Sequence, residues 1–263
     1  MGTYIIGDTH GCYTELMQLI DKIEKEDSDA TFILVGDIVD RGTETYQLVK
    51  WAMENITSDG KYQMIIGNHE KEKIDWINTN TEYIKHNTKE ELNSINIVKN
   101  YPDRYDLFEQ INVATHSEQE TCDFIMEFVK WAEKLQYIKD ITINNQRFII
   151  VHANIPYYLI NEDFTINYEE IDRASEFIVW DRDIDGFGKI PDARLVHGHT
   201  PTILPEAYPY YFKMKDRLNN YGRIVHTSNR YNIDCGIVYK NYDKKANLAA
   251  LRLDDLKEFY LYE

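Results

Sequence analysis

Cysteine, basic residues and long apolar runs are all scarce in this sequence. The three cysteines are odd in number and lack metal-ligand spacing, which argues against a disulfide framework and a thiolate zinc site. The net charge of −16 argues against a general nucleic-acid binder, which needs a basic face. No apolar run approaches the roughly 18 residues of a membrane helix, and no signal-peptide pattern is present. We therefore expect a cytoplasmic protein that binds neither nucleic acid nor membrane.

What the sequence does contain is a regular alternation of apolar runs and amphipathic stretches. Apolar runs at residues 3–7, 31–35 and 62–66 each end in a loop, and helical patterns follow the first two. Continuously apolar strands that alternate with helices are typical of a buried, mainly parallel sheet. The chain of 263 residues, 43% of them hydrophobic, is long enough for one α/β domain. We expect a single domain over residues 1–263.

Residues 72–140 differ in character, because they are polar and mostly helical in pattern. Ser117 and Glu120 have the spacing of a capping box, and an amphipathic helix follows them. We expect a helical insertion that packs beside the sheet, since this stretch is too polar to form its own core. The second half returns to strands. They are expected at residues 141–143, 148–151, 194–196, 231–233, 237–239 and 248–253.

Five short segments hold most of the unusual residue chemistry, and each follows an apolar run. They are GDTHG at 7–11, GDIVDRG at 36–42, GNHE at 67–70, VHAN at 151–154 and HGHT at 197–200. Loops at the carboxyl ends of parallel strands enter the crevice where ligands bind, so all five can meet at one place. A single Asp or His there is more often a cap or turn residue, but six candidate ligands in ordered motifs favour a metal site. The candidate ligands are Asp8, His10, Asp37, Asn68, His152 and His199.

This mixed set of carboxylate, amide and imidazole donors suits transition metals better than Ca²⁺. Six ligands suffice for two cations only if one Asp is shared between them. Two cations about 3.5–4 Å apart can clamp the attacking and leaving oxygens of a phosphoryl displacement. We expect two divalent metal ions per chain, with Mn²⁺ preferred and Fe or Zn²⁺ acceptable.

In type and order, the five segments resemble the metallophosphoesterase superfamily, and within it the phosphoprotein phosphatase branch. The match extends over essentially the whole chain. It implies a calcineurin-like fold, a four-layer α/β/β/α sandwich with the helical insertion at about residues 72–140. It also implies in-line attack on phosphorus by a hydroxide that bridges the metals. The implied ligands are Asp8, His10 and Asp37 for one metal, and Asp37, Asn68, His152 and His199 for the other.

The resemblance also assigns catalytic and phosphate-binding roles. His69 would be the general acid that protonates the leaving oxygen, and Asp40 would hold its imidazole and raise its pKa. Arg41 would contact the phosphate. A second phosphate-binding arginine of the family follows a tryptophan by two residues, as Arg182 follows Trp180. The alternative for Arg182 is a surface salt bridge with a neighbouring aspartate.

One departure separates branches of the superfamily. Many nuclease-like members end in GHxH, whose second histidine is another metal ligand, whereas Pro201 stands at that place here. This favours the phosphoprotein phosphatase branch. The segment at 232–236, NIDCG, resembles the tail of bacterial, phage and diadenosine-tetraphosphatase members rather than that of eukaryotic protein phosphatases.

Three functions are compatible with these residues. The favoured one is hydrolysis of phosphoserine and phosphothreonine in proteins; the alternative is hydrolysis of dinucleoside polyphosphates, such as diadenosine tetraphosphate, at the same centre. A non-catalytic phosphate-binding scaffold should have lost a ligand or the acid, and none is missing. The choice of substrate depends on the cleft walls, expected at residues 72–140 and 204–215. The aromatic stretch at 208–212 could stack on a nucleobase, although packing on the sheet is the favoured interpretation.

Overall fold

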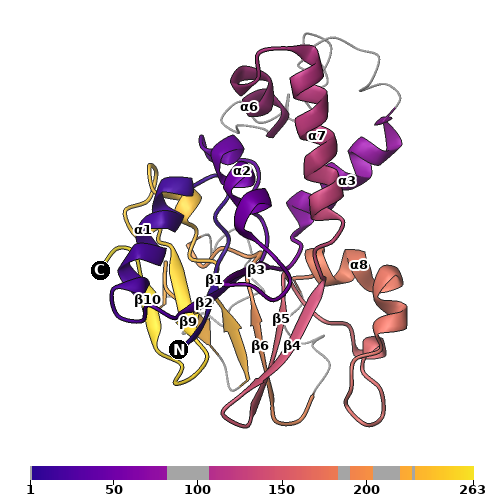
Figure 1. Ribbon diagram of the computed structural model, residues 1–263. Helices are drawn as coiled ribbons and strands as arrows, with labels where there is room; N and C mark the ends of the chain where they lie inside the picture. The colour runs from indigo at the N-terminus through magenta and orange to yellow at the C-terminus, as the bar shows by residue number, and fades with distance from the viewer. Residues whose placement is uncertain (1, 82–106, 183–189, 204–219, 227–228) are drawn as a thin grey trace.

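The computed structural model describes residues 2–81, 107–182, 190–203, 220–226 and 229–263. Within these ranges the strands form two sheets (Figure 1). The first has the order β10-β9-β1-β2-β3 and the second the order β4-β5-β6-β8-β7. The strands of the first sheet are β1 (Thr3–Ile6), β2 (Thr31–Leu34), β3 (Tyr62–Met64), β9 (Ala249–Arg252) and β10 (Glu258–Tyr260). Those of the second are β4 (Ile138–Ile143), β5 (Gln146–Val151), β6 (Ala193–His197), β7 (Val225–His226) and β8 (Arg230–Asn232).

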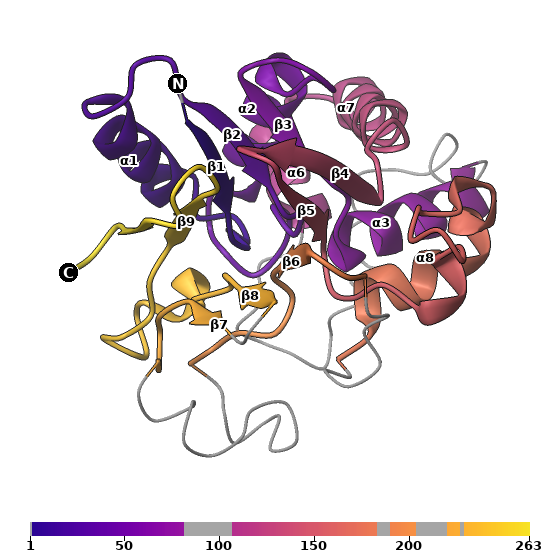
Figure 2. The same cartoon turned by 90° about the horizontal axis from the view of Figure 1, so that it is seen from below.

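Helices cover the outer faces of both sheets. In Figure 2 the helices α1 and α8 lie on opposite sides of the pair of sheets. The helices are α1 (Tyr13–Glu24), α2 (Thr45–Asn55), α3 (Asn68–Thr79), α6 (Leu107–Ala114), α7 (Glu118–Ala132) and α8 (Ile171–Trp180). Short 3₁₀ turns are η1 (Tyr157–Leu159), η2 (Tyr168–Glu170) and η3 (Ile237–Tyr239).

Three apolar layers fill the spaces between helices and sheets. Side chains alternate along a strand, so Tyr4 and Ile6 pack under α1 and α2 while Ile5 enters the space between the sheets. On the second sheet, Ile150 faces that inner space and Ile149 packs with α8. Both faces of the central strands are therefore buried, as their continuously apolar sequence predicted. The α/β/β/α sandwich is confirmed.

The predicted insertion does not form a core of its own. The buried faces of α6 and α7 belong to the same apolar layer as α1 and α2, and Figure 1 shows both helices close to α2 and α3. The side chain of Ser117 caps α7 by accepting a hydrogen bond from the backbone N–H of Glu120. The Glu120 carboxylate accepts from the N–H of His116, one residue before the expected partner. Residues 82–106 of the insertion lie outside the described residues.

The prediction of a strand at residues 237–239 is wrong. Residues 237–239 form the 3₁₀ turn η3, because Gly236 has a left-handed φ of 71° that ends the extended chain before it. In the described part of the chain, no helix is both long and apolar enough to cross a membrane.

Candidate metal centre

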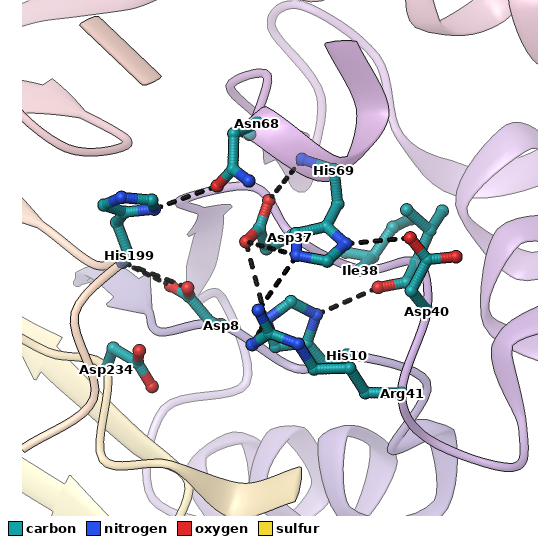
Figure 3. Close-up of polar contacts among 12 residues, drawn as sticks. Asp8, His10, Asp37, Ile38, Asp40, Arg41, Asn68, His69, His199 and Asp234 are labelled. Carbon is teal, nitrogen blue, oxygen red and sulfur yellow. Dashed lines mark hydrogen bonds and ion pairs between the residues drawn. The ribbon is translucent and has the colours of Figure 1, made fainter. Parts of the chain in front are cut away.

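The five predicted segments meet at one edge of the two sheets. Strands β1, β2 and β3 are parallel, and so are β5 and β6, so the loops that leave them emerge at their carboxyl ends. The loop after β3 continues directly into α3, whose first two residues are Asn68 and His69. Figure 3 shows side chains from these loops pointing toward one another around Asp37.

Two groups of side chains bring ligand atoms close enough to hold metal ions. One consists of His10, Asp37 and His69, the other of Asp37, His152 and His199, and within each group the ligand atoms lie within 4.8 Å of one another. Asp37 belongs to both groups. Its Oδ2 lies 3.5 Å from Nε2 of His10 and 3.4 Å from Nε2 of His152. A carboxylate that bridges two cations needs this central position.

The imidazole of His152 presents its Nε2 to oxygen acceptors. Its Nδ1 donates to the carbonyl of Val35 at 2.7 Å, so a neutral ring carries no proton on Nε2. That nitrogen nevertheless lies 2.9 Å from Oδ1 of Asn68 and 3.4 Å from Oδ2 of Asp37. Facing lone pairs repel unless a proton or a metal cation lies among them. Burial lowers the pKa of His152, but the Asp37 carboxylate outweighs it and raises the pKa to about 9.

Three carboxylates are buried at this centre. Asp8, Asp37 and Asp234 are each no more than 3% exposed. Burial and repulsion from Asp234 raise the pKa of Asp8 well above its ordinary value, and burial raises the pKa of Asp234 to about 6. Carboxylates removed from water need compensating cations or protons. Charge and donor chemistry therefore both fit divalent metal ions.

Asp8 and Asn68 both contact residues of the second group. The Asp8 carboxylate accepts from the backbone N–H of His199 at 3.2 and 3.0 Å. Oδ1 of Asn68 lies 2.9 Å from Nδ1 of His199 (Figure 3). It also lies 2.9 Å from Nε2 of His152. Asp8 is in neither three-residue group, whereas His69 takes the third place beside His10 and Asp37.

The guanidinium of Arg41 lies between two imidazoles (Figure 3). Its NH1 is 2.6 Å from Nε2 of His10, and its NH2 is 3.0 Å from Nε2 of His69. Nδ1 of His10 donates to the carbonyl of Val39 at 2.9 Å, which leaves Nε2 as the acceptor. Burial, and then the charge of Arg41, lower the pKa of His10 well below its usual value. His10 is thus a neutral ring that can coordinate a cation when Arg41 turns to another partner.

His69 and Asp40 form a dyad beside the two groups. Nδ1 of His69 lies 2.8 Å from Oδ2 of Asp40, and Nε2 faces the centre, 4.0 Å from Oδ2 of Asp37. Burial raises the pKa of Asp40, but the charge of Lys73 and the hydrogen bond from His69 outweigh it and lower the pKa overall. An ionised Asp40 holds one ring nitrogen and directs the other at the centre, as a proton-transferring histidine requires.

Arg182 and Trp180 lie on the same rim as His199. NH1 of Arg182 donates to the carbonyl of His199 at 3.1 Å and to the Thr200 hydroxyl at 2.6 Å. The Trp180 ring meets the His199 ring edge-on, with centroids 5.8 Å apart, and is 40% exposed. The predicted second arginine therefore lies on the rim of the centre, next to the predicted ligand His199, rather than on a remote surface.

Backbone strain is concentrated at this site. Left-handed φ angles are rare for residues other than glycine and mark places where surrounding contacts enforce a functional geometry. The site residues with such angles are His10 (41°), Asp37 (52°), Asp40 (65°), Arg41 (68°) and His199 (68°).

A family model described as calcineurin-like phosphoesterase matches residues 1–203, which contain all five segments and the dyad. The chain belongs to this family. It is a metallophosphoesterase, a hydrolase of phosphoesters from a family that depends on two metal ions.

Curated relatives of this phosphoesterase are named symmetrical bis(5'-nucleosyl)-tetraphosphatase. The one from Pasteurella multocida is 28% identical over 127 residues, which are 48% of this chain and 43% of the relative. The one from Klebsiella pneumoniae is 36% identical over 70 residues, or 27% of this chain and 24% of the relative. The matched segments thus span less than half the length of these relatives.

Two solved structures resemble the phosphoesterase over nearly all of its length. A candidate diadenosine tetraphosphatase has a TM-score of 0.54 at 14% identity, covering 98% of this chain and 92% of that one. A protein serine/threonine phosphatase from Saccharomyces cerevisiae, with similarity to human phosphatase PP5, has a TM-score of 0.55 at 15% identity, covering 99% and 78%. At such identities the similarity shows the fold alone.

Glu70 has a role in the phosphoesterase that sequence analysis missed. It is fully buried, and burial raises its pKa. Its carboxylate fastens the strained turn at Asp37 to the start of α3. The backbone N–H groups that it accepts from are those of Asp37 (2.8 Å), Ile38 (2.9 Å), Gly67 (3.0 Å) and Val39 (3.2 Å). Glu70 stands three residues after Gly67, the spacing of a capping box, and that spacing was the available signal.

Asp234 was also missed as part of the site. Figure 3 places it next to Asp8, and its Oδ1 accepts from the N–H of Gly236 at 3.0 Å. It lies in the NIDCG segment at 232–236, whose resemblance to bacterial members was the available signal.

Substitution of Gly198 by alanine should disturb the phosphoesterase centre without unfolding the protein. A Cβ at this position would lie 1.9 Å from Oδ1 of Asp8, so Asp8 and the adjoining His199 must shift. Displaced ligand supports typically cost about 10- to 100-fold in metal affinity. Titration calorimetry with Mn²⁺ should show a loss of this size in Gly198→Ala. Gly60→Ala, in an outer turn where the Cβ would meet the Thr57 side chain, is the control. Equal affinity in the two variants would contradict the role given to Asp8.

Proposed function

We propose that this metallophosphoesterase hydrolyses dinucleoside polyphosphates at their polyphosphate chain. The observation that carries the proposal is the set of relatives named tetraphosphatases. The two described above match part of this chain, at 28% and 36% identity. The serine/threonine phosphatase reaction, which the sequence motifs favoured, has support from fold similarity at 15% identity. The dinucleotide substrate is therefore preferred over the phosphoprotein.

The cations are assigned to the side chains that converge at the centre. One site would use Asp8, His10 and Asp37, and the other Asp37, Asn68, His152 and His199. Divalent ions there, preferably Mn²⁺, would polarise phosphate oxygens and make a water molecule acidic. The shared position of Asp37 in both three-residue groups supports its bridging role in this division.

The remaining side chains bind the phosphates and move a proton. Arg41 and Arg182 would hold non-bridging oxygens with their planar guanidinium groups, offsetting transition-state charge. His69 would donate its Nε2 proton to the leaving oxygen as the P–O bond breaks, while Asp40 holds Nδ1. In symmetrical cleavage of diadenosine tetraphosphate, one water molecule adds across the central P–O–P bridge, which yields two molecules of ADP.

Trp180 is suited to hold a nucleobase. Its ring is exposed beside the ligand His199, and stacking on an aromatic face does not depend on the identity of the base. The aromatic stretch at 208–212, also considered for this role, and the cleft wall at 204–215 lie outside the described residues.

Replacing Trp180 by alanine should therefore raise KM for diadenosine tetraphosphate. Stacking contributes about 1–3 kcal/mol per base, which corresponds to roughly 5- to 150-fold. The hydrogen bond between His199 and residue 180 is to the backbone carbonyl of Trp180, which any substitution keeps. Steady-state kinetics should show KM unchanged for p-nitrophenyl phosphate, which has no base, and largely restored for the dinucleotide in Trp180→Phe. An equal effect on both substrates would exclude a role for Trp180 in stacking on a nucleobase.

The proposed substrate is tested by incubating the Mn²⁺-loaded protein with diadenosine tetraphosphate and, in parallel, with a phosphoserine peptide. We expect ADP as the sole nucleotide product of the first and little phosphate from the second. The opposite preference would favour protein dephosphorylation. Inactivity on both would contradict each enzymatic assignment and leave the phosphate-binding scaffold.

The domain organisation and location are proposed on narrower grounds. We take residues 1–263 as one domain, supported by the contribution of both ends of the chain to the first sheet. A cytoplasmic location is supported by the three cysteines, none of which forms a disulfide.

A further inference from the structure

A buried lysine lies behind the dyad of His69 and Asp40. Lys73 is 4% exposed, and its Nζ is 3.1 Å from Oδ2 of Asp40. The same oxygen contacts Nδ1 of His69 at 2.8 Å. His69 and Lys73 are four residues apart on α3, so both side chains project from one face of the helix toward the carboxylate.

The other oxygen of Asp40 is held from a different element. Its Oδ1 accepts from the backbone N–H of Leu107, the first residue of α6, at 3.1 Å. The next residue, Phe108, has its ring centroid 5.6 Å from Nζ of Lys73. The carboxylate of Asp40 is therefore fixed at both oxygens, by α3 on one side and by α6 on the other.

Lysine is rarely buried to this extent, because removing an ammonium group from water is costly unless a partner compensates. Asp40 is itself in a strained left-handed conformation, with a φ of 65°. An apolar side chain in place of Lys73 would leave Asp40 its bonds to His69 and Leu107. The lysine is thus not required to satisfy the carboxylate, which points to a role in setting its orientation.

We propose that Lys73 is a positioning residue for proton transfer: it fixes the Asp40 carboxylate so that His69 keeps its Nε2 directed at the leaving oxygen. This inference rests on the proposed role of His69 in phosphoester hydrolysis. In this proposal Lys73 influences the reaction through its contact with Asp40, besides its packing on the Phe108 ring. The contacts of Lys73 and Leu107 also couple the helical insertion to the reacting groups.

The test compares two aryl phosphates that differ in their need for an acid. Phenyl phosphate releases a basic phenolate that must be protonated, whereas p-nitrophenyl phosphate releases a stabilised anion that leaves without help. Lys73→Met keeps the length of the side chain but removes its charge. We expect kcat on phenyl phosphate to fall about tenfold, a fraction of the 10²–10⁴ of general acid catalysis, with little change on p-nitrophenyl phosphate.

Three controls make the result specific. Lys71→Met removes a lysine from the same helix that pairs with Asp75 and Glu176 instead, and it should leave both substrates unaffected. Lys73→Gln, which retains a donor for Asp40, should lose less than Lys73→Met. In a His69→Asn background, Lys73→Met should cause no further loss, because the lysine acts only through that ring.

Equal losses on both substrates, or a full additional loss in the His69→Asn background, would overturn the proposal. So would loss of Mn²⁺ binding in both Lys73 variants, since that indicates a purely structural role. Wild-type inactivity on both aryl phosphates would show that these monoesters are not substrates, whereas the proposed function itself fails only if diadenosine tetraphosphate is not hydrolysed. The inference about Lys73 can then still be tested by proton NMR. The Nδ1 proton of His69 should shift in Lys73→Met and not in Lys71→Met, and an unchanged resonance would overturn it.

Discussion

Replacement of Asp37 by asparagine is expected to abolish two-metal binding. Oδ2 of Asp37 lies within 4.0 Å of ring nitrogens from both ligand groups, and an amide nitrogen in its place would repel the cations it should share. Oδ1, which accepts from the His69 N–H at 3.0 Å, has an equivalent in asparagine, so the fold should survive. Metal analysis should find well under two Mn²⁺ per chain, and turnover should fall to the metal-free background.

The control for Asp37→Asn is Asp75→Asn, the same change at a carboxylate that is 60% exposed on α3. It should keep both metals and full turnover. Two tightly bound Mn²⁺ ions in Asp37→Asn would contradict the bridging role. Loss of a single ion with the other unweakened would also argue against it.

Replacement of His69 by asparagine should lower turnover of phenyl phosphate by about 10²–10⁴-fold, the usual contribution of general acid catalysis. The ring has one nitrogen held by Asp40 and the other directed at the centre, and asparagine cannot deliver that proton. Metal content is the informative second measurement, because His69 also lies within ligand distance of His10 and Asp37.

Two bound Mn²⁺ ions with low turnover would support His69 as the acid, whereas loss of one ion would reassign it as a ligand. His116→Asn, at an exposed histidine of the described chain, should behave as wild type. Undiminished turnover of phenyl phosphate in His69→Asn would refute both roles.

The positions of the site loops could be predicted because they depend on local sequence. Each motif follows an apolar strand, and parallel strands deliver their loops to the same edge. The layered arrangement of two sheets came from the family resemblance rather than from periodicity. Tyr4 packs in the layer under the helices and Ile5 in the layer between the sheets. A run of consecutive apolar residues does not reveal which side chain faces which layer.

The residues that support the site could not be assigned because their partners are distant in sequence. In the sequence, Lys73 resembles the other surface charges of a polar helix. In the structure it is buried, with the Phe108 ring of α6 packed against its Nζ. Asp234 reaches Asp8 only when the end of the chain returns to the first strands. The expected strand at 237–239 failed for a local reason, since the pattern of apolar residues outweighed the signal of Gly236.

The central claim is a pair of cations on either side of Asp37. It is tested most directly by anomalous scattering from crystals of the protein grown with Mn²⁺. Two peaks should flank the Asp37 carboxylate, one near His10 and the other near His152 and His199. A single peak, or two peaks of which neither contacts Asp37, would contradict the two-cation centre.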